Sequence, residues 1–425
     1  MVTKNGSPDP DSLLGSPDDD ILRGQGGDDL LSGLAGNDLL QGGAGNDLLL
    51  AGTGLDSLYG GADADVLAFD DLSGGQAFGG SGQDLLRLTL AAGPALFLDF
   101  RDGAASQSGT VPGTLSFAGV EHLWLTSLAD GDTVFGSGGD DVMIFGGRGS
   151  EAHGRGGDDL MAYIPNVAAT LDGGEGNDTL QVDAGSNVLY FIVDGSDGSV
   201  DDGQLSVLTG FETFHATGGA QADIASFAAG DDVFMGLFGA DTCFGGLGKD
   251  TLSGGRDTDS LIGGDADDVL IGGGQNDALY GGAGNDSLTG GRGADVIDGG
   301  AGRDRILLYL GDDTVTGGDG ADKFVFNRNQ SGSHLLTDFT HGQDLLLFDP
   351  SLLQFGPGSG PLDPSLFSVG AASGSQAQFV LQYNAETGLS RLTWDPNGDN
   401  PAGGVYGIAR FTGEVTLTAE DILIL

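Results

Sequence analysis

One nine-residue pattern recurs along this chain, and it limits the fold more than any other feature. The pattern is x-G-G-x-G-x-D-x-U, where U is a large apolar residue. It reads "QGGAGNDLL" from Gln41 to Leu49 and "YGGAGNDSL" from Tyr280 to Leu288. Aspartate recurs every nine residues from Asp20 to Asp65, and again from Asp223 to Asp322. A short fixed period predicts one structural unit stacked repeatedly along an axis.

The composition of the unit indicates its local structure. Glycine allows positive φ and close backbone approach, so the first six residues are expected to form a turn. Asparagine in the turn is expected to tolerate the left-handed region as well, at Asn37, Asn46, Asn177, Asn276 and Asn285. The last three residues are expected to form a short strand with the ninth side chain pointing inward. Two units then make one coil, and the stacked coils form an all-β parallel β-roll with two facing sheets.

The charge balance indicates what the turns bind. The chain has 63 acidic and 15 basic residues and a net charge of −48, which disfavours nucleic acid and anionic membranes as partners. Stacking places equivalent aspartates about 4.8 Å apart, where two carboxylates repel by roughly 3–4 kcal/mol at an effective dielectric constant of 20. No Lys or Arg follows the same period. Carboxylates and exposed backbone carbonyls are an all-oxygen ligand set that favours Ca²⁺ over Mg²⁺.

Other features limit the compartment and the class of protein. The single cysteine, Cys243, excludes an intramolecular disulfide and is expected to be a small buried residue. No apolar run is long enough for a transmembrane helix. The first twenty residues lack the apolar core of a secretory signal peptide, so none is expected.

Two segments without the repeat interrupt the array, and both alternate like strands. Each ends in a Gly-apolar-Glu step, at Gly119–Glu121 and Gly210–Glu212, which indicates a duplicated insertion of strand hairpins. A stack also needs a cap over its last apolar layer. We expect an N-terminal tail (1–13), repeat blocks at 14–85, 126–180 and 217–324, inserted strand segments at 86–125 and 181–216, and a C-terminal β cap at 325–425.

These motifs resemble the RTX, or haemolysin-type calcium-binding, repeat proteins over residues 14–324. The C-terminal stretches "GGDGADKFVF" and "LLTDFTHGQDLLLFD" are similar to the region that closes the β-roll in serralysin-type proteins. The resemblance implies a right-handed parallel β-roll with several Ca²⁺ ions in its turns, held by the aspartates and by turn carbonyls. It implies as ligands Asp29, Asp38, Asp47, Asp56, Asp65, Asp84, Asp141, Asp159, Asp178, Asp232, Asp241, Asp250, Asp259, Asp268, Asp277, Asp286, Asp295, Asp304 and Asp322, with Gly42, Gly43, Gly45, Gly281, Gly282, Gly284, Gly290, Gly291 and Gly293.

The resemblance also implies export by a type I secretion apparatus, an ABC transporter, and hence a secreted or cell-surface protein. Its expected role is structural or adhesive, as in a surface layer or an adhesin, with a cell-surface glycan or a second copy of the chain as partner. The alternatives are an extracellular enzyme or toxin with a site in the inserted hairpins or the cap, and a secretion module acting with a separate effector.

The sequence contains no recognisable catalytic motif, so we expect no enzyme. No histidine belongs to H-E-x-x-H, and G-x-S-x-G is absent. His122 and His215 are expected to be surface or strand residues. His334 and His341 flank "LLTDFT" near Asp338 and Asp344, where a metal or base role is the less favoured interpretation. "WDPNGDN" (Trp394 to Asn400) is expected to be a hairpin turn, because its glycine falls at the wrong position for an EF-hand loop.

Overall fold

The structure is a computed structural model. It describes residues 1–91, 96–100, 104–107, 114–146, 150–163, 169–183, 190–194, 199–201, 207–209, 211–331, 333–349, 359–370, 377–395 and 406–425. These residues form strands and turns, with two short 3₁₀ helices and no α-helix among them. The chain divides into two compact units, Met1–Asp183 with Val193–His215 and Ala184–Ile192 with Ala216–Leu425. The all-β prediction is confirmed.

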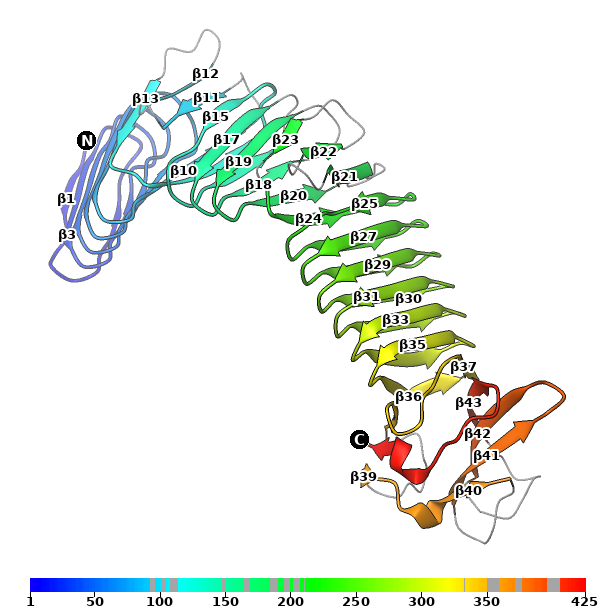
Figure 1. The fold of residues 1–425 in the computed structure, drawn as a ribbon. Helices are drawn as coiled ribbons and strands as arrows, with labels where there is room; N and C mark the ends of the chain where they lie inside the picture. The colour runs from blue at the N-terminus through cyan, green and yellow to red at the C-terminus, as the bar shows by residue number, and fades with distance from the viewer. Residues whose placement is uncertain are drawn as a thin grey trace. The chain divides into compact units, whose positions relative to one another are not determined.

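The first unit contains two stacks of strands (Figure 1). Its first sheet has, in spatial order, β1 (Thr3–Asn5), β3 (Ile21–Gly26), β5 (Leu39–Ala44), β7 (Asp56–Ala62), β9 (Gly75–Ser81), β13 (Thr114–Ala118), β12 (Ala104–Gln107), β11 (Leu96–Asp99), β15 (Thr133–Phe135), β17 (Glu151–Gly156), β19 (Thr170–Glu175) and β23 (Val207–Thr209). Its second stack has β2 (Ser12–Leu14), β4 (Leu30–Ser32), β6 (Leu48–Leu50), β8 (Val66–Phe69), β10 (Leu85–Leu90), β14 (His122–Ser127), β16 (Val142–Phe145), β18 (Leu160–Tyr163) and β20 (Thr179–Asp183).

The second unit repeats this arrangement, and its strands follow one another as successive rungs (Figure 1). One sheet has β25 (Ile224–Ser226), β27 (Thr242–Leu247), β29 (Ser260–Asp265), β31 (Ala278–Ala283), β33 (Val296–Gly302), β35 (Thr314–Gly320), β37 (His334–Leu336), β43 (Tyr406–Thr412), β42 (Leu389–Asp395), β41 (Gln378–Asn384) and β40 (Phe367–Val369). The other stack has β26 (Val233–Leu237), β28 (Thr251–Gly255), β30 (Val269–Gly274), β32 (Ser287–Arg292), β34 (Arg305–Leu310), β36 (Lys323–Ser331), β38 (Leu345–Phe348), β44 (Ile422–Ile424) and β39 (Gly360–Pro361).

Three strands lie where the chain passes from one unit to the other, namely β21 (Tyr190–Asp194), β22 (Ser199–Asp201) and β24 (Thr213–Thr217). The remainder of the predicted second insertion lies outside the described residues. The 3₁₀ helices are η2 (Pro364–Leu366) and η3 (Ala419–Asp421).

The strand register confirms two nonapeptides per coil. Leu40 pairs with Leu58 in parallel, and Leu270 pairs with Leu288, each eighteen residues apart. The ninth-position side chains are buried on the inside of every coil, and Cys243 is among them with no exposed surface. The period therefore sets the core, because one apolar side chain per nonapeptide fills the narrow space between the sheets.

The first insertion is a strand meander within one sheet. β12 pairs antiparallel with β11 on one side and with β13 on the other. β13 then continues the parallel stack beside β9, and β11 continues it beside β15. The second stack closes over the insertion, because β10 pairs directly with β14. The interruption therefore widens one side of the roll and leaves the other continuous.

The C-terminal residues cap the second unit, as predicted. β41, β42 and β43 form an antiparallel sheet that joins the roll where β43 pairs with β37. Aromatic rings cover the last apolar layer, with centroids 4.7 Å apart for Phe326 and Phe348 and 5.1 Å apart for Phe348 and Phe379. Trp394 extends this cluster, and the rest of "WDPNGDN" lies outside the described residues.

Candidate metal site

Each repeat turn depends on its glycines for two different reasons. Gly43 and Gly45 have φ of +126° and +115°, which L side chains rarely adopt. Gly42 has no such φ, but an added Cβ would overlap Oδ2 of Asp47 and lie 2.8 Å from the carbonyl oxygen of Gly60 in the next coil. The first glycine of the pair therefore makes room for a carboxylate, and the other two make the turn.

The aspartates form columns linked by backbone hydrogen bonds. The backbone N–H of Asp29 donates to Oδ1 of Asp47 at 2.8 Å, and that of Asp268 donates to Oδ1 of Asp286 at 2.8 Å. The columns run through Asp11, Asp29, Asp47, Asp65 and Asp84, through Asp20, Asp38 and Asp56, through Asp141, Asp159 and Asp178, through Asp223, Asp241, Asp259, Asp277, Asp295 and Asp313, and through Asp232, Asp250, Asp268, Asp286, Asp304, Asp322 and Asp344.

The second carboxylate oxygen, Oδ2, is buried in most predicted ligands and has no hydrogen-bond partner among the described residues. This holds for Asp29, Asp38, Asp47, Asp56, Asp65, Asp84, Asp159, Asp178, Asp241, Asp250, Asp259, Asp268, Asp277, Asp286, Asp295, Asp304 and Asp322. Buried polar atoms in folded proteins are almost always satisfied, so a repeated set of such oxygens indicates an additional ligand. Asp232 is equally buried, and its N–H donates to Oδ1 of Asp250.

The pKa values of the column aspartates also indicate an additional ligand. Burial, reinforced by the neighbouring carboxylates of the column, raises the pKa of Asp65 and Asp268 to about 7 and that of Asp159 to about 8. The backbone hydrogen bond that each carboxylate accepts works in the opposite direction but does not cancel the effect of burial. At neutral pH these side chains therefore need either a proton or a cation.

The surroundings of each Oδ2 suit a hard cation. In the turn of Asp286, both this oxygen and the carbonyl oxygen of Gly299 border the space that a Cβ on Gly281 would fill. No three His, Cys, Asp or Glu side chains converge anywhere in the described part of the chain. Each turn thus offers one carboxylate, and backbone oxygens must supply the other ligands. Carboxylate and carbonyl oxygens are the ligands that Ca²⁺ takes in flexible geometry, so the residues fit the predicted ion.

Some turns satisfy their own aspartate and differ from the rest. The backbone N–H of Ser137 donates to Oδ2 of Asp141 at 2.7 Å, and its hydroxyl donates to Oδ1. Asp141 was predicted as a metal ligand, but this internal bonding disfavours it. The same four-residue spacing links Ser7 to Asp11, Ser16 to Asp20, Gly219 to Asp223 and Thr340 to Asp344. These closed turns lie at or near the ends of the columns.

The sixth residue of the repeat has a role that the sequence did not reveal. Oδ1 of Asn46 accepts the N–H of Ala64 at 3.0 Å, and Oδ1 of Asn285 accepts that of Arg303 at 3.1 Å. These bonds run toward the following coil, whereas the seventh-position aspartates accept from the preceding one. None of the turn asparagines has positive φ. The expected left-handed conformation is therefore wrong, and asparagine is present because its side chain links coils.

The two Gly-apolar-Glu steps end columns with glutamate in place of aspartate. Oε2 of Glu121 accepts the N–H of Asp84 at 3.0 Å, and Oε2 of Glu212 accepts that of Asp178 at 2.8 Å. The backbone N–H of each glutamate donates back to the carbonyl of the same aspartate. The sequence match between the steps thus corresponds to one shared local structure.

One histidine side chain closes a column of aspartates. Nδ1 of His334 is 2.8 Å from Oδ2 of Asp313, and both side chains are buried, so an imidazole closes the last turn of that column. Nδ1 of His341 is 2.8 Å from Oδ2 of Asp421 in the C-terminal cap. His122 is half-buried on β14 and His215 is exposed on β24, as expected for strand residues.

Comparison with known proteins agrees with this geometry. The family model of the RTX calcium-binding nonapeptide repeat matches residues 5–40, 41–71, 124–150, 169–191, 217–252, 244–279, 253–288, 271–306 and 289–324, more than half of the chain. No curated protein matches the chain. No helix among the described residues is long and apolar enough to cross a membrane. RTX nonapeptide repeats bind calcium, so several Ca²⁺ ions are expected here. The chain belongs to the family of RTX calcium-binding nonapeptide repeat proteins.

Proposed function

We propose that this chain is a secreted structural or adhesive protein whose β-roll folds when Ca²⁺ binds outside the cell. The observation that carries the proposal is the set of buried, unpartnered Oδ2 atoms, one in each open turn. At neutral pH an unneutralised carboxylate in that position opposes folding. A bound cation removes that cost, so ion binding and folding are one equilibrium.

The same coupling suits export through a type I secretion apparatus. Free Ca²⁺ is scarce inside the cell, and a chain with a net charge of −48 and empty turns remains unfolded there. Outside, millimolar Ca²⁺ exceeds the dissociation constants of about 10⁻⁴–10⁻³ M that are typical of extracellular calcium modules. Residues 325–425 are the candidate export signal, and residues 14–324 are the candidate calcium array.

The metal ligands follow from the open turns. Oδ2 of each unpartnered aspartate would supply one oxygen, and backbone carbonyls such as that of a paired glycine in the next coil would supply others. Asp47 with Gly60, and Asp286 with Gly299, are examples. The closed turns, such as that of Asp20, would bind no ion.

Attachment to a surface is the proposed role, because stacked coils repeat the same strands and turns many times along each unit and can offer a partner several equivalent contacts. The test is to coat a surface with purified protein in Ca²⁺ and to measure the attachment of cells or cell-wall polysaccharide. Attachment that is lost on chelation supports the role. Turnover of a substrate by the purified protein would instead favour the alternative of an extracellular enzyme.

A further inference from the structure

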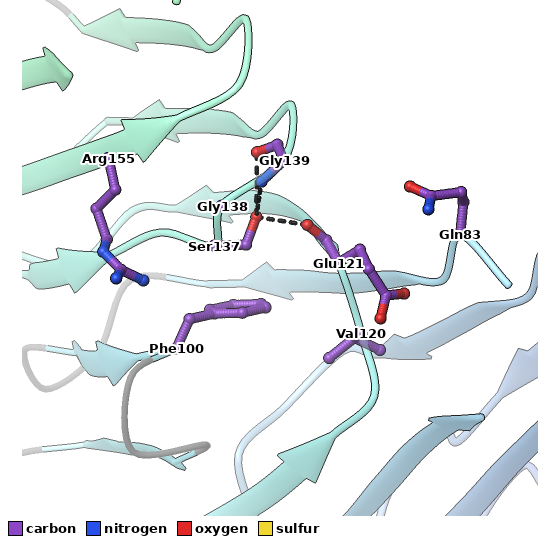
Figure 2. Close-up of a pocket in the computed structure, with 8 residues that line it drawn as sticks. All are labelled: Gln83, Phe100, Val120, Glu121, Ser137, Gly138, Gly139 and Arg155. Carbon is purple, nitrogen blue, oxygen red and sulfur yellow. Dashed lines mark hydrogen bonds between the residues drawn. The ribbon is translucent and has the colours of Figure 1, made fainter. Parts of the chain in front are cut away.

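A pocket of about 440 Å³ lies beside the first insertion, within the first unit (Figure 2). It is lined by Gln83, Phe100, Val120, Glu121, Ser137, Gly138, Gly139 and Arg155. These residues come from the end of β11, the turns before β10 and β14, the turn after β15, and strand β17. The pocket exists because the meander of β11 to β13 displaces one wall of the roll. Its volume falls within the range of small-molecule sites in proteins.

An aromatic ring and opposed polar groups surround this space. Figure 2 shows the Phe100 ring with Arg155 on one side and Val120 and Glu121 on the other. The ring of Phe117 packs 4.6 Å from that of Phe100, which holds the latter in place. The described lining thus combines one apolar face with a guanidinium donor and a carboxylate acceptor.

Several of these side chains are fixed before any ligand arrives. Oε2 of Glu121 accepts the N–H of Asp84, and one guanidinium nitrogen of Arg155 donates to the carbonyl of Gly136 at 3.2 Å. Nε2 of His122 is 2.9 Å from Oε1 of Gln83 and orients that amide. Groups held in this way lose little freedom on binding, so the site is preorganised.

Arg155 occupies a position where the repeat usually has glycine. Its φ is +88°, and the equivalent residues Gly43 and Gly174 have φ of +126° and +117°. An L side chain in this region costs free energy, and such residues concentrate at functional sites. Gln25, Leu34 and Leu237 have the same conformation at this repeat position, so the conformation alone does not mark a site, and the Gln25 amide bonds the carbonyl of Gly6 at the start of the roll. Arg155 bonds a carbonyl in the same manner and also lines the pocket.

We infer that this pocket binds a pyranose unit of a polysaccharide. A sugar ring has an apolar C–H face that stacks on an aromatic ring, and its edge of hydroxyl groups both donates and accepts hydrogen bonds. Phe100 matches the first property, and Arg155, Glu121 and Gln83 match the second. A nucleic acid is disfavoured by the net charge of −48. Glu121 is the only carboxylate among the described lining residues, so the pair of acids required for glycoside hydrolysis is missing and the site binds without cleaving.

This inference rests on the proposed adhesive function and names the class of its ligand. The test uses the full chain in saturating Ca²⁺ with a neutral β-1,4-linked glucose hexamer as the main probe, and with a galacturonate hexamer, titrated against a Ca²⁺-matched blank, to measure whether pairing with Arg155 overcomes the net charge of −48, followed by calorimetry. Binding of the neutral probe assigns Arg155 to hydroxyl groups, and binding of the galacturonate probe alone assigns it to the uronate carboxylate.

Three variants address the pocket. Arg155→Gly restores the residue type that the turn favours, Phe100→Ala removes the stacking face, and Gly138→Phe adds a ring to the pocket lining at a glycine whose added Cβ would meet no described atom within 4 Å. Two matched controls lie elsewhere, Gln25→Gly at the same repeat position and Trp124→Ala at another exposed aromatic residue.

The pocket variants should each weaken binding at least tenfold, while the controls bind like the unchanged protein and all variants keep their calcium-dependent circular dichroism. The inference is overturned if neither probe binds at millimolar concentration, or if the controls lose affinity as much as the pocket variants. If neither sugar probe binds but cell attachment still depends on calcium, the pocket is not the ligand site and the proposed adhesive function is retained.

Discussion

The backbone N–H of Asp268 donates to Oδ1 of Asp286 at 2.8 Å, and this bond leaves Oδ2 of Asp286 buried without a described partner. One carboxylate therefore does two things at once. Its first oxygen fixes the distance to the preceding coil, and its second faces the turn where a cation would bind. The predictions below separate these two roles.

Replacing Asp286 by asparagine should remove one calcium site from the array. The amide oxygen can still accept the Asp268 N–H, but the group opposite becomes a donor that repels a cation. We expect one fewer Ca²⁺ per chain by equilibrium dialysis, and a higher calcium midpoint for folding. Asp20→Asn is the control, because Ser16 already satisfies that carboxylate. An unchanged stoichiometry for Asp286→Asn would exclude this turn as a site.

Substitution of the first paired glycine should act sterically. A Cβ on Gly281 would overlap Oδ2 of Asp286 and the carbonyl oxygen of Gly299, the two atoms assigned to the ion. Gly281→Ala should weaken calcium binding at that turn and destabilise the roll by about 1–3 kcal/mol, the usual range for overpacking. Gly138→Ala has free space around it and should leave urea unfolding in Ca²⁺ unchanged. Equal effects of the two substitutions would contradict the interpretation that Gly281 leaves space for the Asp286 carboxylate and the ion.

The apoprotein should fold more readily in mild acid than at neutral pH. Burial raises the pKa of Asp241 and Asp277 to about 7 from an ordinary 3.8, so the folded state binds more protons than the unfolded state in this interval. The contribution of these carboxyl groups to the free energy of unfolding, without metal, is therefore greatest below about pH 4. It is lost as pH rises through their pKa in the folded state. In chelator, the β-sheet circular dichroism should be stronger at pH 5 than at pH 8.

Calcium affinity should show the opposite trend, because protons and Ca²⁺ compete for the same oxygens. The calcium midpoint should move to higher concentration as pH falls from 8 to 5. A midpoint that does not depend on pH would show that the buried carboxylates are not the ligands.

The hydrogen bonds that the sixth-position asparagines accept from the following coil should stabilise the roll without contributing to calcium binding. Asn285→Ala removes the acceptor for the Arg303 N–H and the bond from its own amide to Asp267. The expected loss is about 1 kcal/mol in urea unfolding at saturating Ca²⁺, since the exposed groups can bond water instead. Asn285→Asp keeps the acceptor but sets a second carboxylate against that of Asp267, so it should lose at least as much as Asn285→Ala. A change in calcium stoichiometry would show that the residue has a different role.

The buried pair of His334 and Asp313 should be sensitive to loss of one partner. His334→Phe leaves the Asp313 carboxylate buried without its imidazole, which typically costs about 3–5 kcal/mol. A second substitution, Asp313→Asn, removes the stranded charge but keeps an acceptor for the Asp295 N–H, so it should recover part of the loss. Thermal unfolding of the single and double variants at saturating Ca²⁺ measures both effects. If the effects of the two single substitutions add up to that of the double variant, the pair is not coupled.

The sequence predicted the repeating part of the fold well, because a strict period repeats one set of local interactions. Ninth-position residues such as Leu49 are in the core, and the glycines with positive φ, such as Gly45, are where the turn requires them. The aspartate columns also follow from the period alone, since residues eighteen apart must stack.

Features that break the period could not be read from the sequence. Glu121 reaches Asp84 across a 37-residue separation, and the pairing of His334 with Asp313 depends on how β36 extends the last coil. Most closed turns have a local signal that sequence reasoning missed, namely a Ser or Thr four residues before the aspartate, as at Ser137 and Asp141, whereas the turn of Asp223 has Gly219 there. The sequence correctly predicted that the asparagines lie in the turns. Their role could not be predicted, because the hydrogen bonds that their side chains accept come from the following coil.

The most direct test of the account is circular dichroism of the purified chain at pH 7.5, first in chelator and then during addition of Ca²⁺. The account predicts little β-structure in chelator, a cooperative gain of β-structure as free Ca²⁺ approaches millimolar concentration, and full reversal when chelator is restored. A chain that is completely folded in chelator at this pH would contradict it, because the buried aspartates would then be stable without a cation.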